Sequence, residues 1–92
     1  MEIVWTETSL ETYYKVVDYL LESWPKNVLE TFQAKVDNLF GNIKNNNNIC
    51  PESKILGLRK CAIDEYNSLI YEILNDKIFL LTFIDNRSEH KY

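Results

Sequence analysis

The sequence is poor in the residues that break regular structure. Only two glycines and two prolines interrupt its 92 residues, while hydrophobic residues make up 46% and aromatic residues 13%. This composition excludes a disordered or collagen-like chain, because neither class carries so many large apolar side chains. A chain of this length has room for one hydrophobic core, since two smaller cores would each bury too little surface to offset chain entropy. We therefore expect residues 1–92 to form a single domain.

Long apolar runs are also missing. No stretch approaches the roughly 20 residues that a membrane-spanning helix requires. The N-terminus has neither the basic region nor the apolar segment of a signal peptide. We expect a cytoplasmic protein that makes no contact with a membrane.

Metal ligands of the usual kinds are scarce. The chain has two cysteines, Cys50 and Cys61, and one histidine, His90. These are too few for the common zinc sites, so we expect no metal and no other cofactor. Thiols in a reducing compartment usually stay reduced, and we therefore expect Cys50 and Cys61 to be free.

Basic residues are outnumbered by acidic ones, 10 to 14, which gives a formal net charge of −4. Proteins that hold nucleic acid by electrostatic attraction normally carry an excess of lysine and arginine, so the balance argues against a generic DNA or RNA binder. The charge is uneven, because residues 47–92 hold six of the bases, including both arginines. A site that binds an anion is expected in this second half.

The first half of the chain predicts one strand and two helices. Glu2 to Thr6 is rich in β-branched and aromatic residues and predicts a short strand. Thr8 and Glu11 have the spacing of a capping box, which predicts a helix over Ser9–Ser23. Its apolar residues recur at helical spacing and predict the buried face: Leu10, Tyr14, Val17, Leu21 and Trp24.

Pro25 suits the first turn of a second helix, because its missing N–H has no partner to lose there. The apolar positions of this helix again lie on one face: Leu29, Phe32, Val36, Leu39 and Ile43. Gly41 lies where the helix could end, and the asparagine-rich segment Lys44–Asn48 predicts a loop. Two helices with so short a link should form an antiparallel hairpin.

From Lys54 the apolar period changes to two, which predicts three strands at Ile55–Ile63, Tyr66–Ile73 and Lys77–Ile84. Short turns join them and predict an antiparallel meander packed on the helices. The last strand is apolar on both faces, which indicates a central place in the sheet or a second face covered by something else, such as a partner protein. The predicted fold class is therefore α+β, in the order β-α-α-β-β-β.

Four short landmarks occur along the chain: Val4-Trp5-Thr6 before the first helix, Leu58-Arg59-Lys60, Leu69-Ile70-Tyr71, and the closing Phe83-Ile84-Asp85-Asn86-Arg87. In their order and spacing they resemble the RelE/ParE superfamily of bacterial toxins, and the resemblance covers nearly the whole chain. The resemblance implies that this protein is the toxin of a type II toxin-antitoxin pair. Such a toxin inhibits growth, and such a pair can stabilise a plasmid. The implied partner is a cognate antitoxin whose flexible segment wraps and silences the toxin.

The resemblance leaves two mechanisms open, because one fold hosts both. RelE-like members cleave messenger RNA on the ribosome, whereas ParE-like members poison DNA gyrase and cleave nothing themselves. The first reading makes this chain a metal-independent endoribonuclease. We place it first because it gives the basic C-terminal tail a role.

Metal-free RNA cleavage requires activation of the 2′-hydroxyl, stabilisation of the phosphate and protonation of the leaving oxygen. A guanidinium group binds phosphate through two parallel hydrogen bonds and keeps its positive charge. A histidine can act as acid or base near neutral pH. Successive strand residues point to opposite faces, so only one of Arg59 and Lys60 can face the substrate. The predicted catalytic residues are Arg87, Arg59, His90 and Tyr92, and the predicted substrate-binding residues are Lys60 and Lys91.

Two alternatives compete with the ribonuclease. Many ParE-like relatives show an arginine followed three residues on by proline, and His90 stands in that place after Arg87. This ending favours a gyrase inhibitor, for which an acidic surface is tolerable because the target is a protein. A chain that has lost toxicity and serves only as a binding module for its antitoxin is the third reading.

Overall fold

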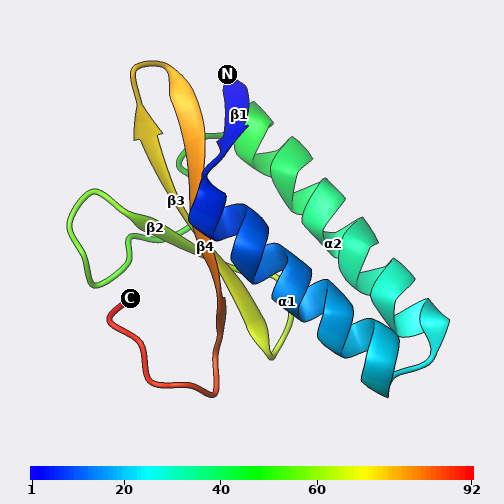
Figure 1. The fold of residues 1–92 in the computed structure, drawn as a ribbon. Helices are drawn as coiled ribbons and strands as arrows, with labels where there is room; N and C mark the ends of the chain where they lie inside the picture. Colours follow the sequence, from blue (N-terminus) through cyan, green and yellow to red (C-terminus); the bar gives the residue numbers. More distant parts are fainter.

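The computed structural model describes residues 1–92, and its elements follow one another in the predicted order β-α-α-β-β-β (Figure 1). The bounds are β1 (Glu2–Trp5), α1 (Glu7–Ser23), α2 (Lys26–Asn45), β2 (Arg59–Ala62), β3 (Asn67–Leu74) and β4 (Lys77–Asp85). Neither helix combines the length and the apolarity that a membrane span needs.

The four strands form one sheet in the order β1-β4-β3-β2. Strands β2, β3 and β4 pair antiparallel, which confirms the predicted meander. Strand β1 pairs with β4 in parallel, so the sheet as a whole is mixed. The chain between β1 and β4, which holds both helices as well as β2 and β3, supplies the long connection that parallel neighbours require. Strand β4 is central, which is one of the two alternatives that its apolar residues on both faces indicated.

Helix α1 begins two residues earlier than predicted, and its cap is Thr6 rather than Thr8. The Oγ1 atom of Thr6 accepts a hydrogen bond of 3.2 Å from the backbone N–H of Ser9, and it donates one of 2.7 Å to the carbonyl oxygen of Leu80. A cap at Thr6 therefore also fastens the start of α1 to the central strand. The sequence predicted the cap at Thr8, and the contact of Thr6 with β4 fixes it two residues earlier.

The buried face of α1 also differs from the prediction. Ser9 and Leu20 are buried, with Tyr13 and Val16 packed against the core, whereas most of the predicted row is exposed: Leu10, Tyr14, Leu21 and Trp24. The ring of Tyr13 meets the rings of Trp5, Phe32 and Phe83 at centroid distances of 5.3 to 6.1 Å. This aromatic cluster fixes which side of α1 faces the sheet.

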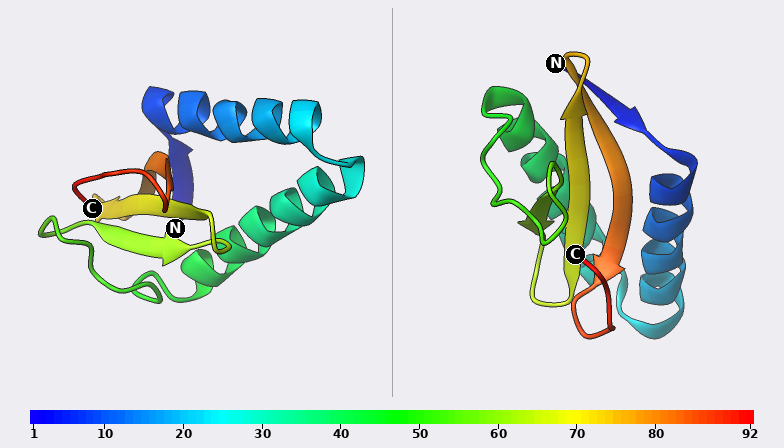
Figure 2. Two further views of the ribbon diagram at one scale, coloured as in Figure 1. Left: turned by 90° about the horizontal axis from the view of Figure 1, so that it is seen from below. Right: turned by 90° about the vertical axis from the view of Figure 1, so that its left-hand side faces the viewer.

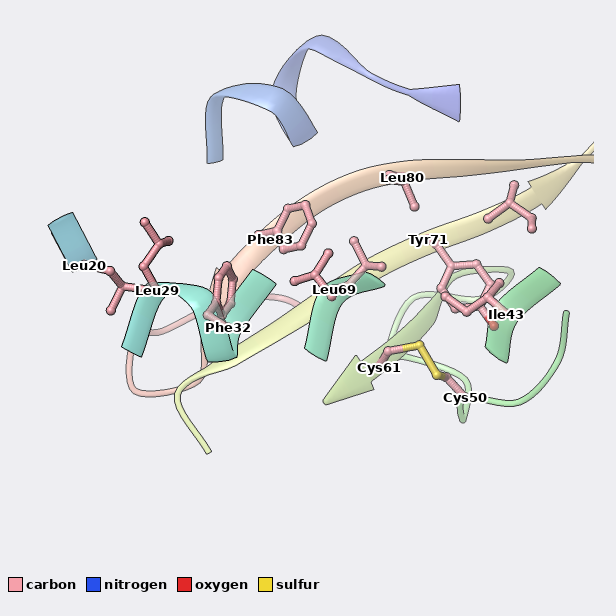
Figure 3. Packing of buried hydrophobic residues seen from close by; sticks show 12 residues of the cluster. Leu20, Leu29, Phe32, Ile43, Cys50, Cys61, Leu69, Tyr71, Leu80 and Phe83 are labelled. Carbon is pink, nitrogen blue, oxygen red and sulfur yellow. A yellow bond between two sulfur atoms is a disulfide. The ribbon is translucent and has the colours of Figure 1, made fainter. Parts of the chain in front are cut away.

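Helix α2 follows Pro25, which occupies its N-cap position, and it continues through Gly41 to Asn45. Its predicted face is confirmed, because Leu29, Phe32, Val36 and Ile43 are buried against the sheet. Figure 3 shows Leu29, Phe32 and Ile43 packed with residues of β3 and β4. The core therefore lies between the sheet and the two helices.

Cys50 and Cys61 form a disulfide, so the prediction of free thiols was wrong (Figure 3). Cys61 lies on β2 opposite Leu69, on the face that packs against the helices. The loop after α2 returns Cys50 to the same place, and the two Cα atoms are 5.2 Å apart. This separation lies within the range that a disulfide spans. Sequence spacing alone could not predict this approach, because it depends on the path of the loop.

Strand β2 is shorter than predicted, since residues 53–58 form a tight loop before it. The backbone N–H of Ser53 donates 2.7 Å to the carbonyl of Leu58, and Gly57 adopts a φ of 87° that favours glycine. The period-two pattern of this segment therefore belongs to a turn and not to a longer strand.

The helices cover one face of the sheet, and the C-terminal segment lies over the other (Figure 2, right). On this outer face Ile70 pairs with Thr82 across β3 and β4, and both side chains are buried. The backbone N–H of Lys54 donates a hydrogen bond of 2.9 Å to the carbonyl oxygen of Tyr92, which anchors the tail. The chain itself therefore covers part of the outer face, while Phe79, Leu81 and Ile84 of β4 stay partly exposed.

Candidate functional site

A groove of about 450 Å³ lies between α1 and the end of the sheet where β4 finishes. Helix α1 and the residue after it supply one wall, and the turn before β3 with the end of β4 supplies the other. The lining residues are Thr12, Lys15, Val16, Tyr19, Leu20, Trp24, Asp64, Tyr66, Asn67, Phe83, Ile84, Asp85 and Arg87. Arg87 is the predicted site residue that lies in this groove.

The guanidinium group of Arg87 is held by its neighbours in the groove. Its Nε donates 3.0 Å to Oδ1 of Asp85, and its Nη2 donates 2.9 Å to Oδ2 of the same carboxylate. The group also lies 4.7 Å from the centre of the Tyr66 ring, which is a cation-π distance. Arg87 therefore presents a paired and stacked cation, with its charge largely balanced by Asp85.

These contacts shift the acid-base behaviour of the site. The hydrogen bond from the Arg87 side chain, followed by that from its backbone N–H, lowers the pKa of Asp85. The carboxylate in turn raises the pKa of Arg87. The pKa of Tyr66 is raised, chiefly by a side-chain hydrogen bond with Glu65. None of the three groups is therefore tuned to exchange protons near neutral pH.

A turn stabilised by side chains positions Tyr66. The carboxylate oxygen Oδ1 of Asp64 accepts hydrogen bonds of 2.8 Å from the backbone N–H groups of Tyr66 and Asn67. Asn86 ties this turn to the end of β4, because its backbone N–H donates 2.8 Å to the carbonyl of Tyr66. The Oγ atom of Ser68 donates 2.7 Å to Oδ1 of Asn86. Hydrogen bonds between the start of β3 and the residues after β4 therefore stabilise the wall of the groove that carries Tyr66 and Arg87.

Arg59 lies elsewhere, in contact with the loop that follows α2. Its Nη1 donates a hydrogen bond of 2.6 Å to the carbonyl oxygen of Cys50, beside the disulfide. Arg59 pairs with Tyr71 on the side of the sheet that faces the helices. The contact fastens the loop to β2, and a phosphate would have to compete with the Cys50 carbonyl for this guanidinium.

The remaining predicted residues belong to the outer face of the sheet and its tail. Lys60 pairs with Ile70, and so lies on the face opposite Arg59. The rings of His90 and Tyr92 lie 6.3 Å apart, and the Nζ atom of Lys91 lies 5.6 Å from the centre of the Tyr92 ring. The Nδ1 atom of His90 is buried without a hydrogen-bond partner. The fold therefore distributes the predicted site over a groove, a loop contact and the outer face of the sheet with its tail.

Sequence reasoning missed the groove residues that α1 contributes. Lys15 and Tyr19 are on the flank of α1 beside β4, and Trp24 follows the helix at its C-cap. The sequence placed Trp24 in the buried row, because its spacing continued the helical period. The many aromatic residues of α1 and its C-cap could have suggested a binding surface. Only the packing of α1 on the sheet shows which of these rings stay exposed.

Comparisons with known proteins agree on the fold. The chain resembles a solved structure described as a chromosomal ParDE TA system from P. aeruginosa, with a TM-score of 0.72, 16% identity, and coverage of 92% of this chain and 95% of that one. It resembles a copper-bound mutant toxin from Helicobacter pylori with a TM-score of 0.69, 14% identity and 94% coverage of both chains. It also resembles a YoeB/ParE toxin from Agrobacterium tumefaciens, with a TM-score of 0.68, 14% identity, and coverage of 94% and 99%.

Comparison of the sequence alone finds no relative. No protein-family model matches the chain, and no curated protein matches it. The similarity is therefore one of structure, extends over nearly the whole chain, and places each element in its expected order. The chain has the fold of the RelE/ParE toxins.

Proposed function

We propose that this protein is the toxin of a toxin-antitoxin pair, and that it acts by binding a protein target through the groove. The observation that carries the proposal is that the groove gathers Arg87 with three exposed rings, while the other predicted catalytic groups lie elsewhere. DNA gyrase is the target that the ParE-like reading names. A cognate antitoxin would be the second partner.

The groove has the side-chain types that dominate protein interfaces. Tyrosine, tryptophan and arginine are enriched among the residues that contribute most to binding energy. Tyr19, Trp24 and Tyr66 are each about half exposed beside Arg87. The rings offer apolar area at small entropy loss, because each has only two rotatable side-chain bonds. A partner that covers them would also desolvate the Arg87–Asp85 pair.

RNA cleavage is the second candidate, and one observation favours it. The C-terminal tail, which contains His90 and Tyr92, lies over the outer face of the sheet, and Lys60 belongs to the same face. An acid-base group and a cation are two of the elements that cleavage needs. Against it, Arg87 is paired with Asp85, Arg59 is bonded to the Cys50 carbonyl, and the net charge of −4 opposes approach to ribosomal RNA.

Controlled expression in a bacterial host without antitoxin tests the toxin role. We expect growth to stop on induction of the wild type and to continue with Arg87→Ala or Trp24→Ala. Lys44→Ala, at the exposed end of α2, is the matched control and should stay toxic. Normal growth on expression of the folded wild-type protein would overturn the toxin role and favour a binding module that has lost toxicity.

Two assays with purified protein separate the mechanisms. The binding reading predicts inhibited supercoiling by gyrase and an intact messenger in a translation extract mapped by primer extension. Cuts that depend on ribosomes and vanish in His90→Ala or Lys60→Ala would instead establish the ribonuclease. Arg87→Ala should relieve gyrase inhibition without unfolding the chain, since its side chain is exposed.

A further inference from the structure

One flank of α1 exposes a row of large apolar side chains. Leu10, Tyr14 and Leu21 are 41%, 57% and 60% exposed. At 3.6 residues per turn they lie within about 40° of one another around the helix axis. Their spacing over 11 positions covers roughly 16 Å along the helix. The three residues therefore form an apolar row on one side of α1, with the partly buried Val17 between Tyr14 and Leu21.

A row of carboxylates runs beside the apolar row. Glu7, Glu11, Asp18 and Glu22 are all exposed, and they follow one another within about 60° on the solvent side of Leu10, Tyr14 and Leu21. None of the four takes part in an ion pair, because the two ion pairs of the protein are Lys77–Glu2 and Arg87–Asp85. Lys15 is the one basic residue of α1, so this flank carries an excess of negative charge.

The protein does not cover the apolar row with its own elements. The two helices diverge from their connecting turn, which Figure 2 (left) shows as an open V. The opposite flank of α1, with Lys15 and Tyr19, lines the groove. The buried side, with Ser9 and Leu20, faces the sheet. The apolar row is thus a third surface of α1, separate from the groove.

The charge of this flank decides among occupants. A second copy of the chain would bring the same carboxylates together, and an anionic membrane surface would repel them. We propose that the row receives a partner helix whose apolar face is edged by lysine or arginine. Leu10, Tyr14 and Leu21 would contact that apolar face, and the four carboxylates would pair with the basic edge. The proposal goes beyond toxicity, since it names the chemistry of a binding partner and not the target.

Two synthetic peptides of about 18 residues test this pairing with the full chain. Both carry the same leucine face and are held helical by a side-chain staple, but one has lysine and the other glutamate along the edge. Fluorescence anisotropy of the labelled peptides measures the dissociation constant. We expect the lysine peptide to bind at least about ten-fold more tightly, with an advantage that shrinks at high salt.

Variants at exposed positions locate the site without disturbing the core. Leu21→Ser should weaken binding of the lysine peptide about ten-fold. The double variant Glu11→Lys, Asp18→Lys should reverse the preference toward the glutamate peptide, and circular dichroism would confirm that both variants stay folded. Equal binding of the two peptides, no binding of either, or a preference untouched by the double variant would overturn the proposal. None of these measurements depends on toxicity. The result for the partner helix is therefore independent of the result for the proposed function.

Discussion

The hydroxyl group of Tyr71 donates a hydrogen bond of 2.6 Å to the carbonyl oxygen of Asn47, 24 residues earlier in the chain. Tyr71 is fully buried, and burial raises the pKa of its hydroxyl. This hydrogen bond joins the centre of β3 to the asparagine run 45–48 at the end of α2. The asparagine loop is therefore fastened to the core at a defined point, close to the disulfide.

Replacing Tyr71 by phenylalanine should lower the free energy of unfolding by about 1 to 2 kcal/mol. The change removes one hydroxyl and leaves the Asn47 carbonyl without its partner in a partly buried place. Urea denaturation followed by circular dichroism measures the difference. Tyr14→Phe is the control, because Tyr14 is exposed and should change stability by less than about 0.5 kcal/mol. Equal effects of the two variants would contradict a stabilising role for the hydrogen bond between Tyr71 and Asn47.

The start of α1 provides a second matched pair of variants. Thr6→Ala removes the cap and the bond to Leu80, and should lower the free energy of unfolding by about 1 to 2 kcal/mol. Thr8 is exposed within the first turn, so Thr8→Ala should be nearly neutral. Thermal denaturation of both variants measures the difference. A larger loss for Thr8→Ala would support the capping box that the sequence suggested and contradict the cap at Thr6.

Much of the fold was predictable because local patterns determine it. The buried face of α2, the order of the elements and the meander follow from apolar spacing and turn residues. The turn between β3 and β4 uses Asn75 and Asp76 at φ angles of 52° and 60°, which these two residue types tolerate better than most. The central place of β4 was one of the two alternatives that its apolar residues on both faces indicated.

The rest depended on contacts between distant segments. Helix α1 has apolar residues on more than one side, so its period could not show that Tyr13 would meet Trp5 and that Leu21 would stay exposed. The disulfide required the return path of the loop. The candidate site was only partly predictable, because Arg87 was identified but its partners Tyr66 and Asp85 become neighbours through the turn and the strand end.

The disulfide between Cys50 and Cys61 should stabilise the chain. It closes a loop with a sequence separation of 11, and its loss should lower the free energy of unfolding by about 3 kcal/mol, mainly by freeing the unfolded chain. Urea denaturation with and without dithiothreitol measures the effect. The double variant Cys50→Ser, Cys61→Ser is the control, since reductant should leave it unchanged. If the wild type alkylates fully under denaturing conditions before reduction, the bond is absent from the purified protein.

The pair of Arg87 and Asp85 makes a prediction about pH. The two hydrogen bonds from Arg87 lower the pKa of Asp85 in the folded state, so this carboxylate is ionised over a wider pH range than in the unfolded chain. The pair therefore contributes its full stability above the unfolded pKa, and loses it as the pH falls through the folded pKa. The contribution is small, because both side chains are largely exposed.

Titration of the Asp85 side-chain carboxyl by NMR measures this pKa directly. We expect the midpoint to lie below the ordinary aspartate value in the wild type and to rise toward it in Arg87→Ala. Arg87→Lys should give a midpoint between the two, because an ammonium group keeps the charge but cannot form the two-pronged contact. If Asp85 titrated alike in all three proteins, the paired guanidinium would not be the state of Arg87 in solution. The groove would then present a free cation, and the pairing with Asp85 would no longer oppose phosphate binding by Arg87.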